Sequence, residues 1–243
     1  MAATIHDLLG RLFPDGCTVG VEGDFVRGVG HAGGRTITVV GTTNDAAIGV
    51  ELALAMATEV LRTVREHPGR ALLLLIDTQG QRLRRRDELL GINAYMAHLA
   101  QCLEVARRAG HRIVSLVYGR AVSGGYITGG MMADTCNALA SAEISVMNLP
   151  AMARVTKIAQ SRLEELAQSS PVFAPGADNY LKMGALDSLW SDDVAAALMR
   201  ALDGPDAPAA GRSDRRRDLG DARGGRTRAR AVSQRVRTDA VDD

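Results

Sequence analysis

The sequence predicts an α/β domain in which short strands alternate with amphipathic helices. Two apolar runs, residues 71–76 and 113–117, are short enough to be strands that are buried on both faces. Apolar side chains recur at helical spacing in the segments that follow residue 48 and residue 87. At 243 residues, the chain is long enough for one substantial core, or for one domain and a tail.

The first 34 residues predict an N-terminal arm and a hairpin. Residues 1–16 are typical of a short helical arm, and the glycine-rich residues 17–34 indicate an irregular β-hairpin. Residues 35–40 are rich in β-branched side chains and end at Gly41, which predicts a strand. The main domain is therefore expected to begin at residue 35.

Two long helices are expected in the first half of this domain. Asn44 and Asp45 are candidates to cap the first helix, which should end before Pro68. Its buried side is predicted to hold Ile48, Leu52, Ala55, Met56, Val60 and Val64. The second helix is expected over residues 87–109, with Gly110 as its C-terminal cap.

The second half of the domain predicts shorter elements and then a tail. In chain order these are a glycine-rich helix over 124–133, strands at 136–140 and 144–147, helices from 149 and over 161–168, loops over 171–190 and a last helix over 192–202. Residues 203–243 consist mostly of Arg, Asp, Ala and Gly. Because such a segment buries too little apolar surface to fold, we expect a disordered C-terminal tail.

Composition argues against several classes of function. A net charge of +1 and an aromatic content of 3% argue against nucleic acid as a partner. The three cysteines are far apart and odd in number, which is typical of reduced thiols in a cytoplasmic protein. No histidine or cysteine pair has the spacing of a metal site. We see no signal peptide and no membrane-spanning segment.

The most informative segment is Ser123-Gly124-Gly125, which follows the predicted strand 113–117. A strand, a Gly-Gly turn and the start of a helix place free backbone N–H groups at one point. Such a point can hold a carboxylate, a phosphate or a thioester oxygen that becomes negative during a reaction. The segment therefore favours acyl chemistry without a side-chain nucleophile. The alternative is a structural turn in which the glycines only allow close packing.

Ser123 is a weak candidate for a nucleophile. All five histidines precede it in the chain, whereas a serine peptidase of the ClpP type needs a histidine after its serine. Three residues separate Gly119 from Ser123, so the G-x-S-x-G motif is absent. We favour a role for the Ser123 hydroxyl in orienting a substrate carboxylate.

The polar segment 77–81 is predicted to be a loop at the end of a strand, where ligands bind in open α/β sheets. Gln79 and Gly80 are therefore candidates for a wall of the substrate site, and a turn or helix cap is the alternative. Arg82 and Arg84 to Arg86 form a basic cluster. This cluster is suited to the phosphates of a CoA-like group, or else it is a solvated face or a subunit contact.

Five segments together resemble the carboxyltransferase branch of the crotonase superfamily, and within it the gamma subunits of biotin-independent malonate decarboxylases. The segments are residues 41–50, 77–81, 86–93, 117–125 and 153–157. The resemblance implies a crotonase-like superhelix of repeated β-β-α units over residues 35–202. The tail 203–243 lies outside it.

This resemblance also implies a function. Gamma and beta subunits would form a heterodimer, or a larger assembly, that decarboxylates a malonyl thioester on an acyl carrier protein bearing a CoA-derived group. This chain would bind no cofactor and no biotin. The backbone amides of Gly124 and Gly125 would form an oxyanion hole beside Ser123, and Val122 and Tyr126 would line the substrate. Tyr126 stands where the family has smaller or aliphatic side chains, so we expect it to narrow the site.

Two other functions remain open from the sequence. The chain is also compatible with one half of a biotin-dependent carboxyltransferase that acts on an acyl-CoA. It is also compatible with a scaffold that has no catalytic group of its own and completes the site of its partner.

Overall fold

The computed structural model describes residues 4–147, 149–169, 175–204, 215–226 and 229–240. Its strands are β1 (Cys17–Glu22), β2 (Phe25–Ala32), β3 (Arg35–Thr42), β4 (Ala46–Ile48), β5 (Ala71–Gln81), β6 (Ile113–Val122), β7 (Thr135–Leu139), β8 (Glu143–Ser145) and β9 (Ser188–Trp190). The helices up to residue 132 are α1 (Ile5–Leu12), α2 (Val50–Glu66), α3 (Arg85–Leu89), α4 (Ile92–Arg108), α5 (Ser123–Thr128) and the 3₁₀ turn η1 (Gly130–Met132). The later helices are α6 (Leu149–Thr156), α7 (Gln160–Ser169), α8 (Ala177–Lys182), α9 (Val194–Leu202), α10 (Arg216–Ala222) and α11 (Ala229–Asp239).

One sheet with the strand order β1-β2-β3-β5-β6-β7-β9 organises the domain, and β4 and β8 pair with it off this path. The hairpin β1–β2 is antiparallel and pairs with β3, whereas β3, β5, β6, β7 and β9 are parallel. The predicted hairpin and the strand at residue 35 are therefore confirmed.

The long strands β5 and β6 each serve two layers of strand pairing. Their first halves pair with β3 and β7, and their last residues pair with β4 and β8. The register between β5 and β6 shifts between Ile76 and Thr78, where the chain passes from the first layer to the second. A strand of the first layer, a strand of the second and a helix thus recur along the chain, as the β-β-α units that the sequence resemblance implies.

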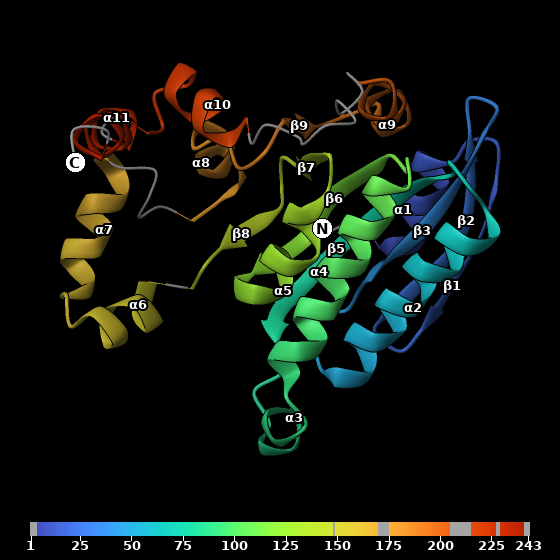
Figure 1. The fold of residues 1–243 in the computed structure, drawn as a ribbon, viewed down its shortest axis with the longest axis horizontal. Coiled ribbons are helices and arrows are strands. Elements are labelled where there is room, and N and C mark those ends of the chain that lie inside the picture. Colours follow the sequence, from blue (N-terminus) through green and yellow to red (C-terminus); the bar gives the residue numbers. More distant parts are fainter. Residues whose placement is uncertain (1–3, 148, 170–174, 205–214, 227–228, 241–243) are drawn as a thin grey trace.

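Helices cover both faces of the sheet (Figure 1). Leu72 and Leu74 of β5 belong to a core cluster that includes residues of α2 and α4, and Leu73 and Leu75 belong to a second cluster with residues of α1 and α9. Because successive side chains of a strand point to opposite faces, the uninterrupted leucine run of β5 is buried on both sides. This confirms the predicted buried strand.

Two predicted loops at strand ends are in fact strand. Residues 77–81 continue β5, and residues 118–122 continue β6, so α5 begins at Ser123 directly after the strand. The polar and glycine-rich composition of these residues indicates a loop. Pairing with the distant strands β4 and β8 overrides it because that pairing supplies partners for the backbone.

The start of α2 also differs from the prediction. Asn44 and Asp45 adopt left-handed conformations, with φ of 60° and 51°, and lead into β4 instead of capping the helix. The helix begins at Val50, whose backbone N–H donates to the buried carboxylate of Asp87 at 3.1 Å. A side chain from α3 therefore performs the capping that a local residue was expected to perform.

The secondary structure of three further segments differs from the prediction. The helix expected over 87–109 is split into α3 and α4 at Gly91, which has φ of 77°. The helix expected over 124–133 ends at Thr128 and is followed by η1. The expected loops of 171–190 contain α8 and β9, and β9 is ordered by its pairing with β7. Part of this segment, residues 171–174, lies outside the described residues.

The N-terminal arm and hairpin belong to the same body as the rest of the domain. Leu8 and Leu12 of α1 are fully buried in the cluster that α9 shares. Strand β2 pairs with β3 from Phe25 to Ala32. Residues 1–34 therefore fold onto the sheet and do not form a separate unit.

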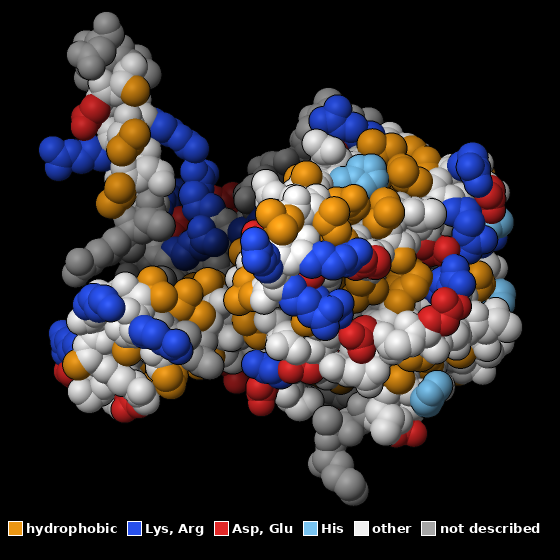
Figure 2. All heavy atoms as spheres, turned by 90° about the horizontal axis from the view of Figure 1, so that it is seen from below, with side chains coloured by type: hydrophobic (Ala, Val, Ile, Leu, Met, Phe, Trp, Pro, Cys, Tyr) orange, Lys and Arg blue, Asp and Glu red, His pale blue; other side chains and the backbone are white. Residues whose placement is uncertain are grey.

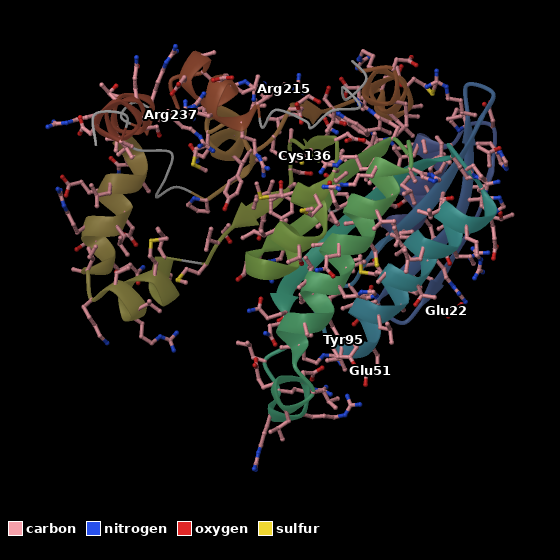
Figure 3. The ribbon with its side chains drawn as sticks, viewed as in Figure 1. Glu22, Glu51, Tyr95, Cys136, Arg215 and Arg237 are labelled. Carbon is pink, nitrogen blue, oxygen red and sulfur yellow. The ribbon has the colours of Figure 1, made fainter. Side chains whose placement is uncertain are left out.

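The segment that we expected to be a disordered tail contains two helices among its described residues. Arg223, after α10, donates hydrogen bonds to the carbonyls of Leu181 and Leu186 and holds this part against α8. Figure 3 shows Arg237 on α11, away from the sheet. Polar contacts of arginine with backbone carbonyls thus anchor a segment that has few large apolar side chains. Among the described residues, no helix is long and apolar enough to cross a membrane.

Burial of α1 leads to a test of stability. We expect Leu12→Ala to lower the free energy of unfolding by about 2–5 kcal/mol, because it removes a fully buried side chain and leaves a cavity. Urea denaturation followed by circular dichroism measures this change. The matched control is Leu54→Ala on α2, where the side chain is 44% exposed and the expected loss is below about 1 kcal/mol. Equal losses for the two variants would contradict the packing of α1 in the core.

Candidate active site

The Ser123-Gly124-Gly125 turn lies at the carboxyl end of β6, where the chain enters α5. Ser123 adopts the left-handed conformation with φ of 52°, whereas the two glycines do not. The glycines are therefore not needed for an unusual backbone angle. Their role is steric.

Gly125 lies directly against the backbone of β5. A Cβ atom at this position would lie 3.0 Å from Cα of Gly80 and 3.2 Å from Cδ1 of Ile48. Gly80 itself has φ of 103°, which disfavours any side chain there. A Cβ atom on Gly124 would lie 3.0 Å from Oε1 of Gln81. The structure thus places Gly125 against Gly80, and Gly124 against Gln81.

The amides of Gly124 and Gly125 belong to the first turn of α5, where backbone N–H groups have no acceptor within the helix. No other described segment supplies a backbone acceptor for them. The Gly80 amide differs, because it donates to Oγ1 of Thr78 at 3.0 Å. Two neighbouring donors therefore remain for a ligand oxygen at Gly124 and Gly125, and Gly80 contributes space only.

A carboxylate beneath the turn holds the strands in place. Asp77 Oδ2 accepts the Asp45 N–H, and Oδ1 accepts the Arg120 N–H, each at 2.9 Å. The Asp77 N–H donates to Oγ1 of Thr42 at 3.2 Å. The side chain of Asp77 also occupies the space that a Cβ atom on Gly119 would need. One residue of β5 therefore ties β6 to the chain that leads into β4.

A small polar network extends from Asp77. The Arg120 guanidinium donates to Oδ2 of Asp45 at 2.6 Å, and the Gln79 side-chain amide donates to the Asp45 carbonyl at 2.9 Å. Asp45 Oδ1 is buried and accepts no hydrogen bond from the described residues. The sequence does not single out Asp45 or Arg120 as site residues, because their charges alone do not distinguish them from the many surface Asp and Arg residues of the chain.

Not all of the predicted substrate-binding residues lie beside the amide turn. Gln79 is exposed beside the network, and the backbone of Val122 lies against Gly80. Tyr126, which we expected to narrow the substrate site, instead points into the core with 2% of its surface exposed. Its ring lies 6.4 Å from the ring of Tyr180, and burial raises the pKa of Tyr126 well above its ordinary value. The helical turn of α5 directs this side chain away from the amides.

Ser123 has no histidine partner. The buried His111 precedes β6 at the opposite end of that strand, and its Nδ1 lies 2.8 Å from the Arg70 carbonyl. His98 lies on α4, beside Cys102. The geometry therefore provides no general base for a serine nucleophile in the described part of the chain.

A cleft of about 320 Å³ opens at the same end of the sheet. It lies between the β1–β2 turn and the start of α2, where Figure 3 labels Glu22 and Glu51. Arg82, which follows β5, also lines it. Among the residues that the structure describes, no group of three or more His, Cys, Asp or Glu side chains is placed to hold a metal ion.

Comparison with known proteins gives a consistent result. A family model described as the malonate decarboxylase gamma subunit matches residues 43–240. The malonyl-S-ACP:biotin-protein carboxyltransferase MADD of Malonomonas rubra is 35% identical over 196 residues, which cover 74% of this chain and 67% of that protein.

Solved structures agree with this result. A Pseudomonas malonate decarboxylase hetero-tetramer in complex with coenzyme A contains a chain that superimposes with a TM-score of 0.75 at 26% identity, and the match covers 97% of both chains. A Pseudomonas MdcD-MdcE hetero-dimer gives a TM-score of 0.72 at 26% identity, covering 96% of this chain and 97% of that one. The transcarboxylase 12S subunit, at 19% identity and a TM-score of 0.70 over 84% of this chain and 42% of that one, shares the fold.

Removal of the Asp77 carboxylate should loosen the site. We expect Asp77→Ala to lower the free energy of unfolding by about 1–3 kcal/mol, because the amides of Asp45 and Arg120 lose their acceptor. Urea denaturation measures the change. The control Asp192→Ala removes an exposed carboxylate and should change stability by less than about 0.5 kcal/mol. If Asp77→Ala and the control have equal free energies of unfolding, the Asp77 carboxylate does not stabilise the packing of these strands.

Proposed function

The chain belongs to the malonate decarboxylase gamma subunit family, and we propose that it acts with a beta subunit to decarboxylate malonyl-S-acyl carrier protein to acetyl-S-acyl carrier protein. The observation that carries this proposal is the amide turn at Gly124 and Gly125. Its two donors have no acceptor among the described residues, and Gly125 lies against the backbone of Gly80.

The amide turn suits the chemistry of this reaction. When the malonyl group loses CO₂, the electron pair of the broken C–C bond moves toward the thioester carbonyl, and the carbonyl oxygen becomes an enolate oxygen. Protonation of the carbon then gives the acetyl group. Two backbone N–H groups that face the oxygen stabilise this charge more strongly in the transition state than in the substrate. One such donor typically contributes about 3 kcal/mol.

We also propose which part of this chain contacts the beta subunit in the complex. Helices α6 and α7 stand apart from the sheet in Figure 1 and pack mainly on one another. Val155 and Ile158, at the end of α6 and just after it, are 67% and 37% exposed, and Val146, which precedes α6, is 55% exposed. Apolar side chains exposed on α6 and beside it are suited to burial against a second subunit. We therefore assign α6 and α7 to the contact with the beta subunit.

The prosthetic group enters this proposal as part of the substrate. The CoA-derived arm belongs to the carrier protein, so this chain needs no cofactor of its own and no biotin. Cys17, Cys102 and Cys136 form no disulfide among the described residues, which suits a protein of the cytoplasm, and we propose that location.

A second candidate function is carboxyl transfer to biotin. The name of the Malonomonas rubra relative, a malonyl-S-ACP:biotin-protein carboxyltransferase, favours it. The same enolate would form at the same amide turn, but the carboxyl group would pass to biotin on another protein. Decarboxylation by the purified complex without any biotin protein separates the two candidates. A complex that turns over only when a biotin protein is added would favour carboxyl transfer.

Substitution of Gly125 tests the amide turn. In the co-purified complex of beta and gamma subunits, we expect Gly125→Val to reduce kcat for malonyl-thioester decarboxylation by about 10²–10³-fold, because the new side chain forces the turn away from Gly80. The matched control is Gly20→Val, where a Cβ atom meets no atom within 4 Å. Size-exclusion chromatography verifies that both complexes remain assembled. Normal turnover by an assembled Gly125→Val complex would make this chain a scaffold.

Substitution of Ser123 tests the absence of a nucleophile. We expect Ser123→Ala to keep kcat within about tenfold of the wild-type value, because the amide donors remain and no covalent intermediate is needed. Single-turnover kinetics and mass spectrometry of the trapped complex measure this. An acylated Ser123, or a loss of about 10⁴-fold or more, would identify the serine as a nucleophile.

A further inference from the structure

The short helix α3 presents an unusual combination of side chains to solvent. Leu83 and Leu89 are 81% and 76% exposed, and Leu90 is 48% exposed. Arg84 and Arg85 are exposed beside them. We call these five residues the α3 surface. Leucines exposed to this extent and clustered on one protruding element are typical of a protein interaction site.

The α3 surface is held firmly from behind. Asp87 is 1% exposed, and its carboxylate accepts the N–H of Val50 at the start of α2. The Arg86 guanidinium forms an ion pair with Glu51 of α2 at 2.6 Å. Arg86 and Asp87 thus attach α3 to α2. Arg84 and Arg85 form no ion pair with any described residue. The exposed part of α3 and its flanks therefore combines a fixed backbone with apolar side chains, the Glu88 carboxylate and two arginines without an ion pair among the described residues.

The α3 surface lies close to the amide turn. Oε1 of Gln81 lies against Gly124, and α3 begins four residues after Gln81. Four residues span at most about 14 Å of extended chain. Figure 1 shows α3 protruding beyond one end of α4, and Figure 2, which views the molecule from that side, shows arginine side chains beside apolar ones. A protein bound to α3 would therefore stand at the entrance to the amide turn.

We propose that the α3 surface docks an acidic acyl carrier protein, which delivers its malonyl thioester to the amides of Gly124 and Gly125. This proposal rests on the proposed function and identifies the surface that recognises the substrate carrier. The two free arginines attract a negatively charged surface, and the leucines bury apolar area once the surfaces meet. A carrier must bind and leave in every cycle, and a small basic and apolar patch suits such a transient contact.

The beta subunit is the other possible occupant, and the structure favours the carrier. The exposed apolar side chains around α6 lie on another part of the molecule. The α3 surface is separate from them, follows β5 directly and is charged. A beta subunit bound at α6 and α7 would therefore leave the α3 surface available for the carrier protein.

The experiment compares two substrates that share the CoA-derived arm. Decarboxylation by the co-purified complex is measured with malonyl-S-acyl carrier protein and with malonyl-CoA. For Arg85→Glu and Leu89→Ser, we expect kcat/KM for the carrier-bound substrate to fall about tenfold or more, mainly through KM. For Leu89→Ser, we expect kcat/KM for malonyl-CoA to stay within about twofold, because that substrate makes no contact through a carrier protein. An equal fall with both substrates for Arg85→Glu would assign that arginine to the phosphates of the shared arm.

Matched controls lie on α2. Arg65→Glu reverses a charge that is 77% exposed at the far end of that helix, and Leu61→Ser changes a leucine that is 38% exposed. Neither control should change kcat/KM for either substrate. For Leu89→Ser, equal losses for both substrates, or no loss for either, would overturn the proposal. Dissociation of the complex in size-exclusion chromatography would assign the α3 surface to the beta subunit instead.

A binding measurement separates this proposal from the proposed function. Titration of the complex with carrier protein that lacks its prosthetic group, at low and high salt, reports docking without chemistry. We expect binding to the wild-type complex to weaken with salt and with Arg85→Glu. If the wild-type complex binds the carrier but decarboxylates neither substrate, the proposed function fails and the docking surface stands. If the carrier does not bind, the docking surface is wrong.

Discussion

The change of strand partners along β5, at the register shift between Ile76 and Thr78, is the constraint on which the candidate site depends, and the Asp77 carboxylate stabilises it. A strand that serves two layers must change partners along its length, which leaves backbone groups without a ladder partner at the change. Asp77 accepts two of these, from Asp45 and Arg120, and so joins the start of the second layer to both long strands. Gly119 must lack a side chain for this carboxylate to fit.

Beyond this change of strand partners, the groups available to a ligand are backbone amides. A Cβ atom on Gly125 would lie 3.0 Å from Cα of Gly80, and one on Gly80 would lie 3.1 Å from the Val122 carbonyl oxygen. The first amides of α5 are left without acceptors among the described residues. A site of this kind is positioned by strand register and not by rotamers, which makes it rigid. It also explains why the residues around it look ordinary in composition. Under the proposal above, substrate selection falls to surfaces around the turn, such as the exposed leucines and arginines at α3.

Much of the fold and part of the site follow from local sequence. The leucine run of β5, the apolar spacing in α2 and α4, and the Gly-Gly pair after β6 each predict their own element, because one strand or helix imposes its own periodicity. The segments that resemble the carboxyltransferases indicate the family from the order of residues alone. Gly80, Gly124 and Gly125 are predicted as site residues, and the structure places Gly125 against Gly80.

Tertiary pairing decided what local sequence leaves open. Residues 77–81 and 118–122 are polar or glycine-rich, yet they are strands because β4 and β8 supply partners from elsewhere in the chain. Tyr126 follows the glycines directly, but the turn of α5 sends its ring into the core. Asp45 and Arg120 become part of the site only through the carboxylate of Asp77. Sequence alone determines periodicity, glycine positions and family, since these depend on neighbouring residues. Contacts between distant strands depend on the whole chain, and only the folded structure decides them.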